Sequence, residues 1–121
     1  VKARRLEYPD AQVVAHIQCT PQVKLLADAV TTTNGIVRFA RETSARTVIV
    51  AAEVGILHYL KKENPGKTFI AASELGSCAT MKLVTQEAVL WSLEHLSPVI
   101  EIPEDIRKKA KPVVDAMLAR R

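Results

Sequence analysis

The chain alternates short runs of apolar, often β-branched residues with longer segments in which apolar residues recur at helical spacing. The apolar runs predict strands over residues 12–15, 46–51, 68–72 and 99–102. Each run is apolar on both of its faces, so we expect each strand to be covered by helices on both sides. Strands of this kind form a parallel sheet with helical crossover connections.

The segments between these runs contain residues that typically begin and end helices. Thr20 and Pro21 supply an N-cap and a proline at the first helical position, and the stretch 64–66 ends a later helix. The predicted helices cover residues 21–30, 36–42, 53–62 and 80–95 and a final segment from 103 onward, and residues 2–7 form the end of another. The helix over 80–95 is apolar on most faces and should be largely buried, whereas Pro112 should kink or restart the last helix.

This order of elements predicts an α/β fold, a three-layer αβα sandwich with a short parallel sheet of about four strands. The length of 121 residues predicts a single α/β domain over 1–121. Because the sequence begins at Val1 rather than at Met, we expect a piece of a longer polypeptide.

Composition and charge narrow the class of protein. Hydrophobic residues make up 48% of the chain and charged residues 25%, which is typical of a globular domain. The net charge is +4, but the dense basic run over 107–111 has no interleaved aromatic residue, so we expect no nucleic-acid partner. No apolar stretch approaches the ~18 residues of a membrane span, so we expect no membrane partner. The two cysteines, Cys19 and Cys78, make no disulfide framework, which favours a reducing, cytoplasmic setting.

Polar side chains follow the first three predicted strands. In open parallel sheets, ligands bind beyond the carboxyl ends of the strands. This rule selects residues 16–19 after the first strand, 53–55 after the second and 73–78 after the third. The segment 31–35 adds hydroxyl groups and backbone N–H groups at the start of a helix, where the helix dipole favours an anion.

Each of these candidates also has a structural interpretation. Capping by Thr33 or Asn34 explains the segment 31–35 more simply than an anion site. A histidine at a strand end, such as His16, is more often structural than catalytic, and Cys19 is more readily a small core residue than a ligand. Cys78 differs, because a thiolate just before a helix is stabilised by the helix N-terminus. The carboxylates that follow the second and third strands, Glu53 and Glu74, are acid–base candidates for which helix capping is the default.

Several of these segments, taken in order, resemble the quinolinate synthases. Residues 14–19 (VAHIQC) resemble the HPEC segment of that family, and residues 26–36 (LADAVTTTNGI) resemble its LAD…GSTSGI segment. Residues 52–57 (AEVGIL) resemble its TEVGI segment, and residues 78–82 (CATMK) resemble its C-x-x-M segment. The resemblance covers nearly the whole chain.

The resemblance implies an iron–sulfur enzyme of NAD biosynthesis that condenses iminoaspartate with dihydroxyacetone phosphate to quinolinate. Such enzymes hold a [4Fe–4S] cluster with three cysteines and consist of three related α/β domains. This chain would be the last domain with the C-terminal helices, so its partners would include the missing N-terminal domains. A homo-oligomer is also possible. Taken alone it should be inactive.

The resemblance also implies roles for individual residues. His16 and Gln18 would be catalytic, Cys78 would be the one cluster ligand in this chain, and Cys19 would not be a ligand. The substrate-binding residues would be His16, Ile17, Gln18, Thr32 and Thr33.

Some positions depart from the family pattern. Gln18 stands where the family has Glu, and an amide cannot accept a proton as a carboxylate does. Ile17 replaces Pro, and Thr31 and Asn34 replace Gly and Ser. These departures keep two alternatives open, a divergent paralogue and a non-catalytic, stand-alone α/β anion-binding module. A third is an interaction fragment with uncovered apolar surface.

Overall fold

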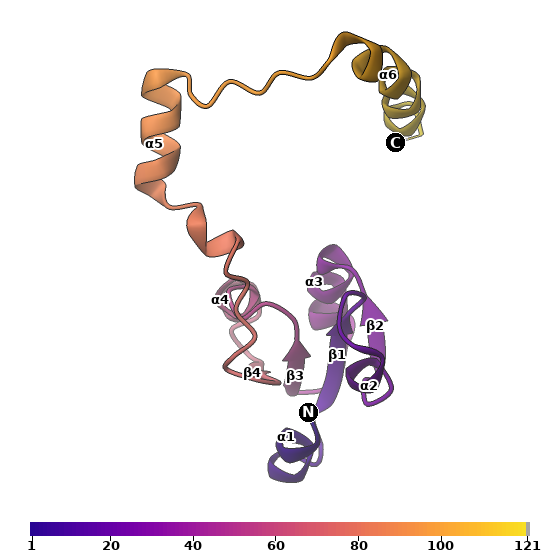
Figure 1. Ribbon diagram of the computed structural model, residues 1–121. Coiled ribbons are helices and arrows are strands. Elements are labelled where there is room, and N and C mark those ends of the chain that lie inside the picture. Colours follow the sequence, from indigo (N-terminus) through magenta and orange to yellow (C-terminus); the bar gives the residue numbers. More distant parts are fainter. Residues whose placement is uncertain (121) are drawn as a thin grey trace. The chain divides into compact units, whose positions relative to one another are not determined.

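The computed structural model describes residues 1–120, which divide into two compact units (Figure 1). The first unit is Val1–Ala79, and the second begins at Thr80. Within the described residues, no helix combines the length and the apolar character needed to cross a lipid bilayer. The assignment of the whole chain to the last domain of a larger enzyme stays a prediction.

The first unit is built on a four-stranded sheet in which every neighbouring pair of strands is parallel. The strands are β1 (Gln12–His16), β2 (Ala29–Thr31), β3 (Thr47–Ala51) and β4 (Thr68–Ala71). Their order across the sheet is β2-β1-β3-β4, so β1 and β3 are central. The predicted α/β fold with a short parallel sheet of about four strands is therefore confirmed.

Helices flank both faces of this sheet. They are α1 (Lys2–Glu7), α2 (Pro21–Lys24), α3 (Thr33–Glu42) and α4 (Ile56–Glu63). On one face, Ile36 of α3 and Leu60 of α4 are fully buried in a cluster with Val14. On the other face, Tyr8 at the end of α1 packs against the cluster that contains Val13. Truncating a buried leucine such as Leu60 to alanine typically costs about 2–5 kcal/mol, so these contacts fix the helices to the sheet.

The predicted helix over 21–30 is wrong in its second half. The helix α2 ends at Lys24, and Ala29–Thr31 form the edge strand β2 instead. The backbone N–H of Asp28 donates to the carbonyl of Val13 at 2.8 Å, and its carboxylate accepts from the N–H of Val13 at 2.7 Å. These two bonds hold Ala29–Thr31 next to β1. Pairing with β1 then outweighs the weak helical preference of the segment.

The second unit also differs from the sequence-based expectation. It contains the 3₁₀ turn Met81–Leu83, α5 (Gln86–His95) and α6 (Glu104–Leu118). The helix α5 begins only at Gln86, because Thr85 caps it by accepting from the N–H of Ala88 at 3.1 Å. Its apolar side chains are exposed rather than buried, with Trp91 at 51% and Leu93 at 68%.

The expected strand over 99–102 is also wrong, because these residues have no regular secondary structure. A strand needs a hydrogen-bonded neighbour, and the four strands of the sheet pair only with one another. The helix α6 continues through Pro112, so a restart at that residue is wrong as well.

The side chain of Lys67 caps the C-terminal end of α3. Its ammonium donates to the carbonyls of Ala40 at 2.7 Å, Arg41 at 3.2 Å and Thr43 at 2.6 Å. The last carbonyls of a helix lack partners within the helix, and a cation there also opposes the negative end of the helix dipole.

We expect Lys67→Met to lower the free energy of unfolding by about 1–3 kcal/mol, because it leaves these carbonyls without their charged donor. Urea unfolding followed by circular dichroism measures the change. The matched control is Lys61→Met, at an exposed position of α4, which should change stability by less than about 0.5 kcal/mol. Equal midpoints for the Lys67 and Lys61 variants would show that the cap contributes nothing.

Candidate functional site

The carboxyl ends of the four strands lie at one edge of the sheet, because all strands are parallel. β1 ends at His16, β2 at Thr31, β3 at Ala51 and β4 at Ala71. The segments that follow these residues carry the predicted site residues, so the sheet gathers them at the edge where α/β folds bind ligands.

His16 and Thr33 are brought together by the pairing of β1 with β2. The register places His16 opposite Thr31, and Thr33 follows two residues later as the first residue of α3. The Nε2 atom of His16 lies 3.4 Å from the hydroxyl oxygen of Thr33. The backbone N–H of Gln18 donates to Nδ1 of His16 at 3.3 Å. In the neutral ring the proton is therefore on Nε2, which makes the atom facing Thr33 a donor.

Thr32 caps α3, and this leaves the hydroxyl of Thr33 for His16. The Thr32 hydroxyl accepts from the N–H of Gly35 at 3.3 Å. Capping at this segment is thus real, but it is performed by Thr32 rather than by Thr33 or Asn34. The exposed N-terminal turn of a helix offers backbone N–H groups and a positive partial charge, so an anion could bind beside Thr33.

The residues after His16 turn sharply toward the neighbouring strands. The N–H of Ile17 donates to the carbonyl of Thr31 at 2.9 Å, and the N–H of Cys19 donates to the carbonyl of His16, also at 2.9 Å. The thiol of Cys19 donates to the carbonyl of Ala51 at 3.1 Å. Cys19 is therefore hydrogen-bonded to the end of β3 and is half-buried rather than part of the core, while Gln18 is exposed to solvent.

Lys24 also lies at this edge, although no motif in the sequence points to it. Its ammonium donates to the carbonyl of Ile17 at 3.2 Å, so it brings a positive charge to the carboxyl edge. The only signal in the sequence was a lysine in the last turn of a short helix, which is common at helix C-termini for structural reasons.

The loop after β4 places Cys78 on the same side of the fold. The N–H of Val54 donates to the carbonyl of Gly76 at 2.8 Å, which ties the loop to the segment that follows β3. A side chain at Gly76 would lie 3.1 Å from the carbonyl oxygens of Ala52 and Ser73, so the loop packs closely there. Cys78 follows two residues later and is half-buried.

A complete metal centre is not formed by this part of the protein. Among residues 1–120, no three His, Cys, Asp or Glu side chains gather closely enough to hold a metal ion. Cys78 has the right chemistry for one thiolate ligand of a cluster, but a cluster that needs three cysteines does not fit this chain alone. The predicted metal role of Cys78 stays a prediction.

The two acidic candidates have partners of different kinds. A carboxylate oxygen of Glu53 accepts from the N–H of Gly55 at 2.7 Å, next to the start of α4, in line with the capping interpretation. Glu74 pairs with Arg4 of α1 at 3.3 Å and caps no helix.

Gly35 is needed where α3 approaches the end of β2. A Cβ atom at Gly35 would lie 1.9 Å from the hydroxyl oxygen of Thr31, far inside a normal contact distance. We expect Gly35→Ala to lower the free energy of unfolding by about 1–3 kcal/mol, because the start of α3 must shift to relieve the clash. Chemical denaturation measures this change.

The matched control is Gly66→Ala, because a Cβ atom there meets nothing within 4 Å. This substitution should be neutral or stabilising by about 0.4–1 kcal/mol through the loss of freedom in the unfolded chain. A Gly35 variant as stable as the Gly66 variant would contradict the close packing of α3 against β2.

Comparison with known proteins places this site in a family. The family model described as "Quinolinate synthetase A protein" matches residues 1–119. The quinolinate synthase of Pelobacter propionicus is 47% identical over 119 residues, which are 98% of this chain and 39% of that relative. The quinolinate synthase of Geotalea uraniireducens is 47% identical over 113 residues, 93% of this chain and 37% of that relative. Quinolinate synthase 1 of Methanosarcina acetivorans is 41% identical over 113 residues, again 93% of this chain and 37% of that relative.

The match runs through both units and includes every residue of the strand-end site. The chain spans about two-fifths of the length of the curated relatives that it matches. The resemblance found in the sequence is thereby confirmed, and the chain belongs to the quinolinate synthetase A family.

Proposed function

We propose that this chain is part of a quinolinate synthase, which condenses iminoaspartate with dihydroxyacetone phosphate to quinolinate in NAD biosynthesis. The observation that carries the proposal is the 3.4 Å contact between His16 and Thr33 at the carboxyl edge of a chain that belongs to this family. The chain would contribute one side of a substrate pocket, and the rest of the enzyme would supply the other side. We place the enzyme in the cytoplasm.

The proposed roles follow from the chemistry of each group. His16 offers an Nε2–H donor that can hydrogen-bond to a substrate oxygen and stabilise negative charge that develops on it. Thr33 and Thr32 lie at the N-terminus of α3, where a substrate carboxylate gains from the hydroxyl groups and from the helix dipole. Ile17 and Gln18 would line the pocket, and the Gln18 amide can orient a substrate but cannot act as a base.

The proposed cofactor is a [4Fe–4S] cluster with Cys78 as one of its three cysteine ligands. When bound, such a cluster supplies a Lewis-acidic iron with an open coordination position. The other two ligands would come from outside this chain, whose remaining cysteine, Cys19, is hydrogen-bonded to Ala51.

The alternative proposal is a divergent paralogue or a non-catalytic anion-binding module. Gln18 favours it, because an amide at this position keeps the capacity to bind a substrate and removes any acid–base capacity. The α3 N-terminus, Thr33 and the ammonium of Lys24 would serve a binding protein as well as an enzyme.

A chimeric enzyme tests the proposed reaction. In it, this chain replaces the segment that it matches in the Pelobacter propionicus quinolinate synthase. We expect the chimera to form quinolinate from iminoaspartate and dihydroxyacetone phosphate, measured by chromatography. His16→Ala should lower kcat by about 10²–10³-fold, as expected for the loss of a hydrogen-bond donor to a developing negative charge.

The matched control is His58→Ala, at an exposed position of α4, which should leave kcat unchanged. A folded chimera that binds a C4 dicarboxylate in calorimetry but forms no quinolinate would contradict the enzymatic proposal and favour the binding module.

Anaerobic reconstitution with iron and sulfide tests the cofactor. The 121-residue chain alone should form no stable cluster, because its two cysteines are fewer than the three ligands required. The chimera should show the visible absorbance and the iron content of a [4Fe–4S] cluster. Cys78→Ser should abolish both signals in the chimera, whereas Cys19→Ser should leave them intact. A stoichiometric cluster on the monomeric 121-residue chain would contradict the shared ligand set.

A further inference from the structure

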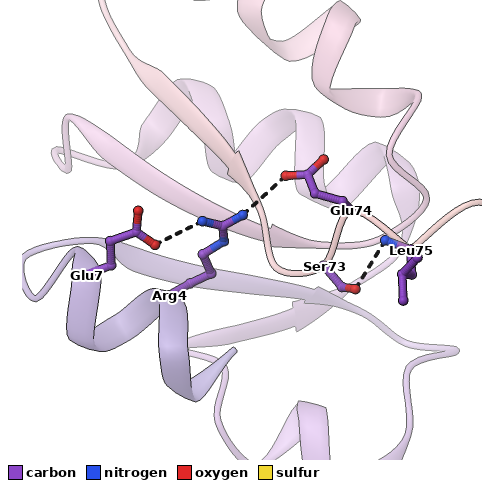
Figure 2. Close-up of polar contacts among 5 residues, drawn as sticks. All are labelled: Arg4, Glu7, Ser73, Glu74 and Leu75. Atoms are coloured by element: carbon purple, nitrogen blue, oxygen red, sulfur yellow. Dashed lines mark hydrogen bonds and ion pairs between the residues drawn. The ribbon is translucent and has the colours of Figure 1, made fainter.

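Arg4 joins the first helix to the loop that follows β4. Its Nη1 atom lies 2.9 Å from a carboxylate oxygen of Glu7, and its Nη2 atom lies 3.3 Å from a carboxylate oxygen of Glu74 (Figure 2). The Glu7 contact lies within α1, but the Glu74 contact bridges elements far apart in the sequence. The guanidinium thus contacts two carboxylates that are themselves exposed to solvent.

The shared guanidinium also affects ionisation at this point. The hydrogen bond from Arg4 holds the pKa of the Glu7 carboxyl below its ordinary value, and the same bond raises the pKa of Arg4. The hydrogen bond thus favours the charged form of both partners.

The loop also has hydrogen bonds within itself and to the segment after β3. The N–H of Leu75 donates to the hydroxyl of Ser73 at 3.2 Å (Figure 2), and the N–H of Gly76 donates to the carbonyl of Ser73 at 3.1 Å. The bond from Val54 to Gly76 ties the loop to the segment after β3. The contact with Arg4 ties it to α1 on another side, four residues before Cys78.

The helix α1 is itself anchored to the sheet, so a contact with it can restrain the loop. Val1 and Tyr8, at its two ends, pack against the cluster of Val13 and Ile49 on one face of the sheet. Arg5 of the same helix pairs with Asp28 at 2.7 Å. The helix is thus fixed to the sheet by contacts that do not involve Arg4.

We propose that Arg4 is a positioning residue that holds the loop carrying Cys78 in place through Glu74. The inference rests on the proposed role of Cys78 as a cluster ligand, since a thiolate must be presented in a defined position to share a cluster with distant cysteines. Ligand groups that are held in advance by surrounding contacts bind a metal better than groups that must first be ordered.

The reactivity of the Cys78 thiol tests this inference. Alkylation by iodoacetamide is followed on the metal-free 121-residue chain, and peptide mass spectrometry separates Cys78 from Cys19. Arg4→Gln and Glu74→Gln should each raise the alkylation rate of Cys78 about two- to fivefold, the range expected for loss of a solvent-exposed ion pair. The rate of Cys19, which is bound to Ala51, should stay unchanged.

Arg4→Gln and Glu74→Gln together distinguish the loss of the contact from a change in the electric field at the Cys78 thiol. Arg4→Gln removes a positive charge and Glu74→Gln removes a negative one, so a field effect on the thiol would have opposite signs in the two variants. The matched control is Glu7→Gln, which weakens the contacts of Glu7 with Arg4 and Tyr8 and leaves the Arg4–Glu74 pair in place, so it should change the Cys78 rate by less than about 1.5-fold. Arg4→Lys should protect Cys78 from alkylation better than Arg4→Gln does, because one ammonium can still reach Glu74.

Salt provides an independent test of the same ion pair. In 1 M salt, where the Debye length is about 3 Å, the alkylation rate of Cys78 in the parent chain should approach that of the variants.

Rates for Cys78 that match the parent in both Arg4→Gln and Glu74→Gln would overturn the inference. So would opposite effects in these two variants, or an equal increase at Cys78 and Cys19, which would indicate general loosening of the fold. This test is separate from that of the proposed function. A chimera without quinolinate synthase activity would remove the proposed reaction and leave the alkylation result standing, whereas unchanged alkylation would remove only the positioning role.

Discussion

The geometry of the site depends on the bonds that Asp28 makes to β1. One carboxylate oxygen accepts from the backbone N–H of Val13 and the other from the guanidinium of Arg5, both at 2.7 Å. Its own N–H donates to the carbonyl of Val13 at 2.8 Å. These bonds fix the register of β2 against β1, and a shift by one residue would turn every side chain of β2 to the other face. Since His16 lies opposite Thr31 in this register, the bonds of Asp28 help to place Thr33, at the start of α3, beside the imidazole ring.

The central strands could be predicted from the sequence because their signal is local. The stretches 12–15, 46–51 and 68–72 are short, rich in apolar residues and buried in the structure, which is typical of strands covered by helices on both faces. The edge strand β2 could not be predicted in the same way. Val30 continues the spacing of apolar residues that begins in α2, and the three residues of β2 become a strand only through bonds to β1. The stretch 99–102 is the opposite case. Its composition is typical of a strand, but it forms none because no neighbouring strand pairs with it.

The site was predictable to the level of segments but not of individual contacts. Parallel strands place their carboxyl ends together, so His16 and the threonines after β2 could be assigned to one edge from the sequence alone. Which of the adjacent threonines caps the helix could not be assigned, because each has the same hydroxyl group. The backbone geometry gives the cap to Thr32 and leaves Thr33 facing His16. Arg4 and Lys24 were not found, since long side chains reach partners that no local pattern specifies.

The charges around the carboxyl edge support the proposed binding of an anionic ligand. Glu74 is paired with Arg4 of α1, and Glu53 accepts from the backbone N–H of Gly55, so both carboxylates that follow β3 and β4 have donors of their own. The groups that remain directed to the edge are donors: the imidazole Nε2–H, the first turn of α3 and the ammonium of Lys24. Donors of this kind attract carboxylates and phosphates. A glutamate at position 18 would add a base to this edge but would also repel an anionic ligand, whereas Gln18 removes both effects. Gln in place of Glu at position 18 thus favours the binding of an anion and disfavours proton transfer. The first effect suits a binding module, and the second counts against an acid–base role of this position in an enzyme.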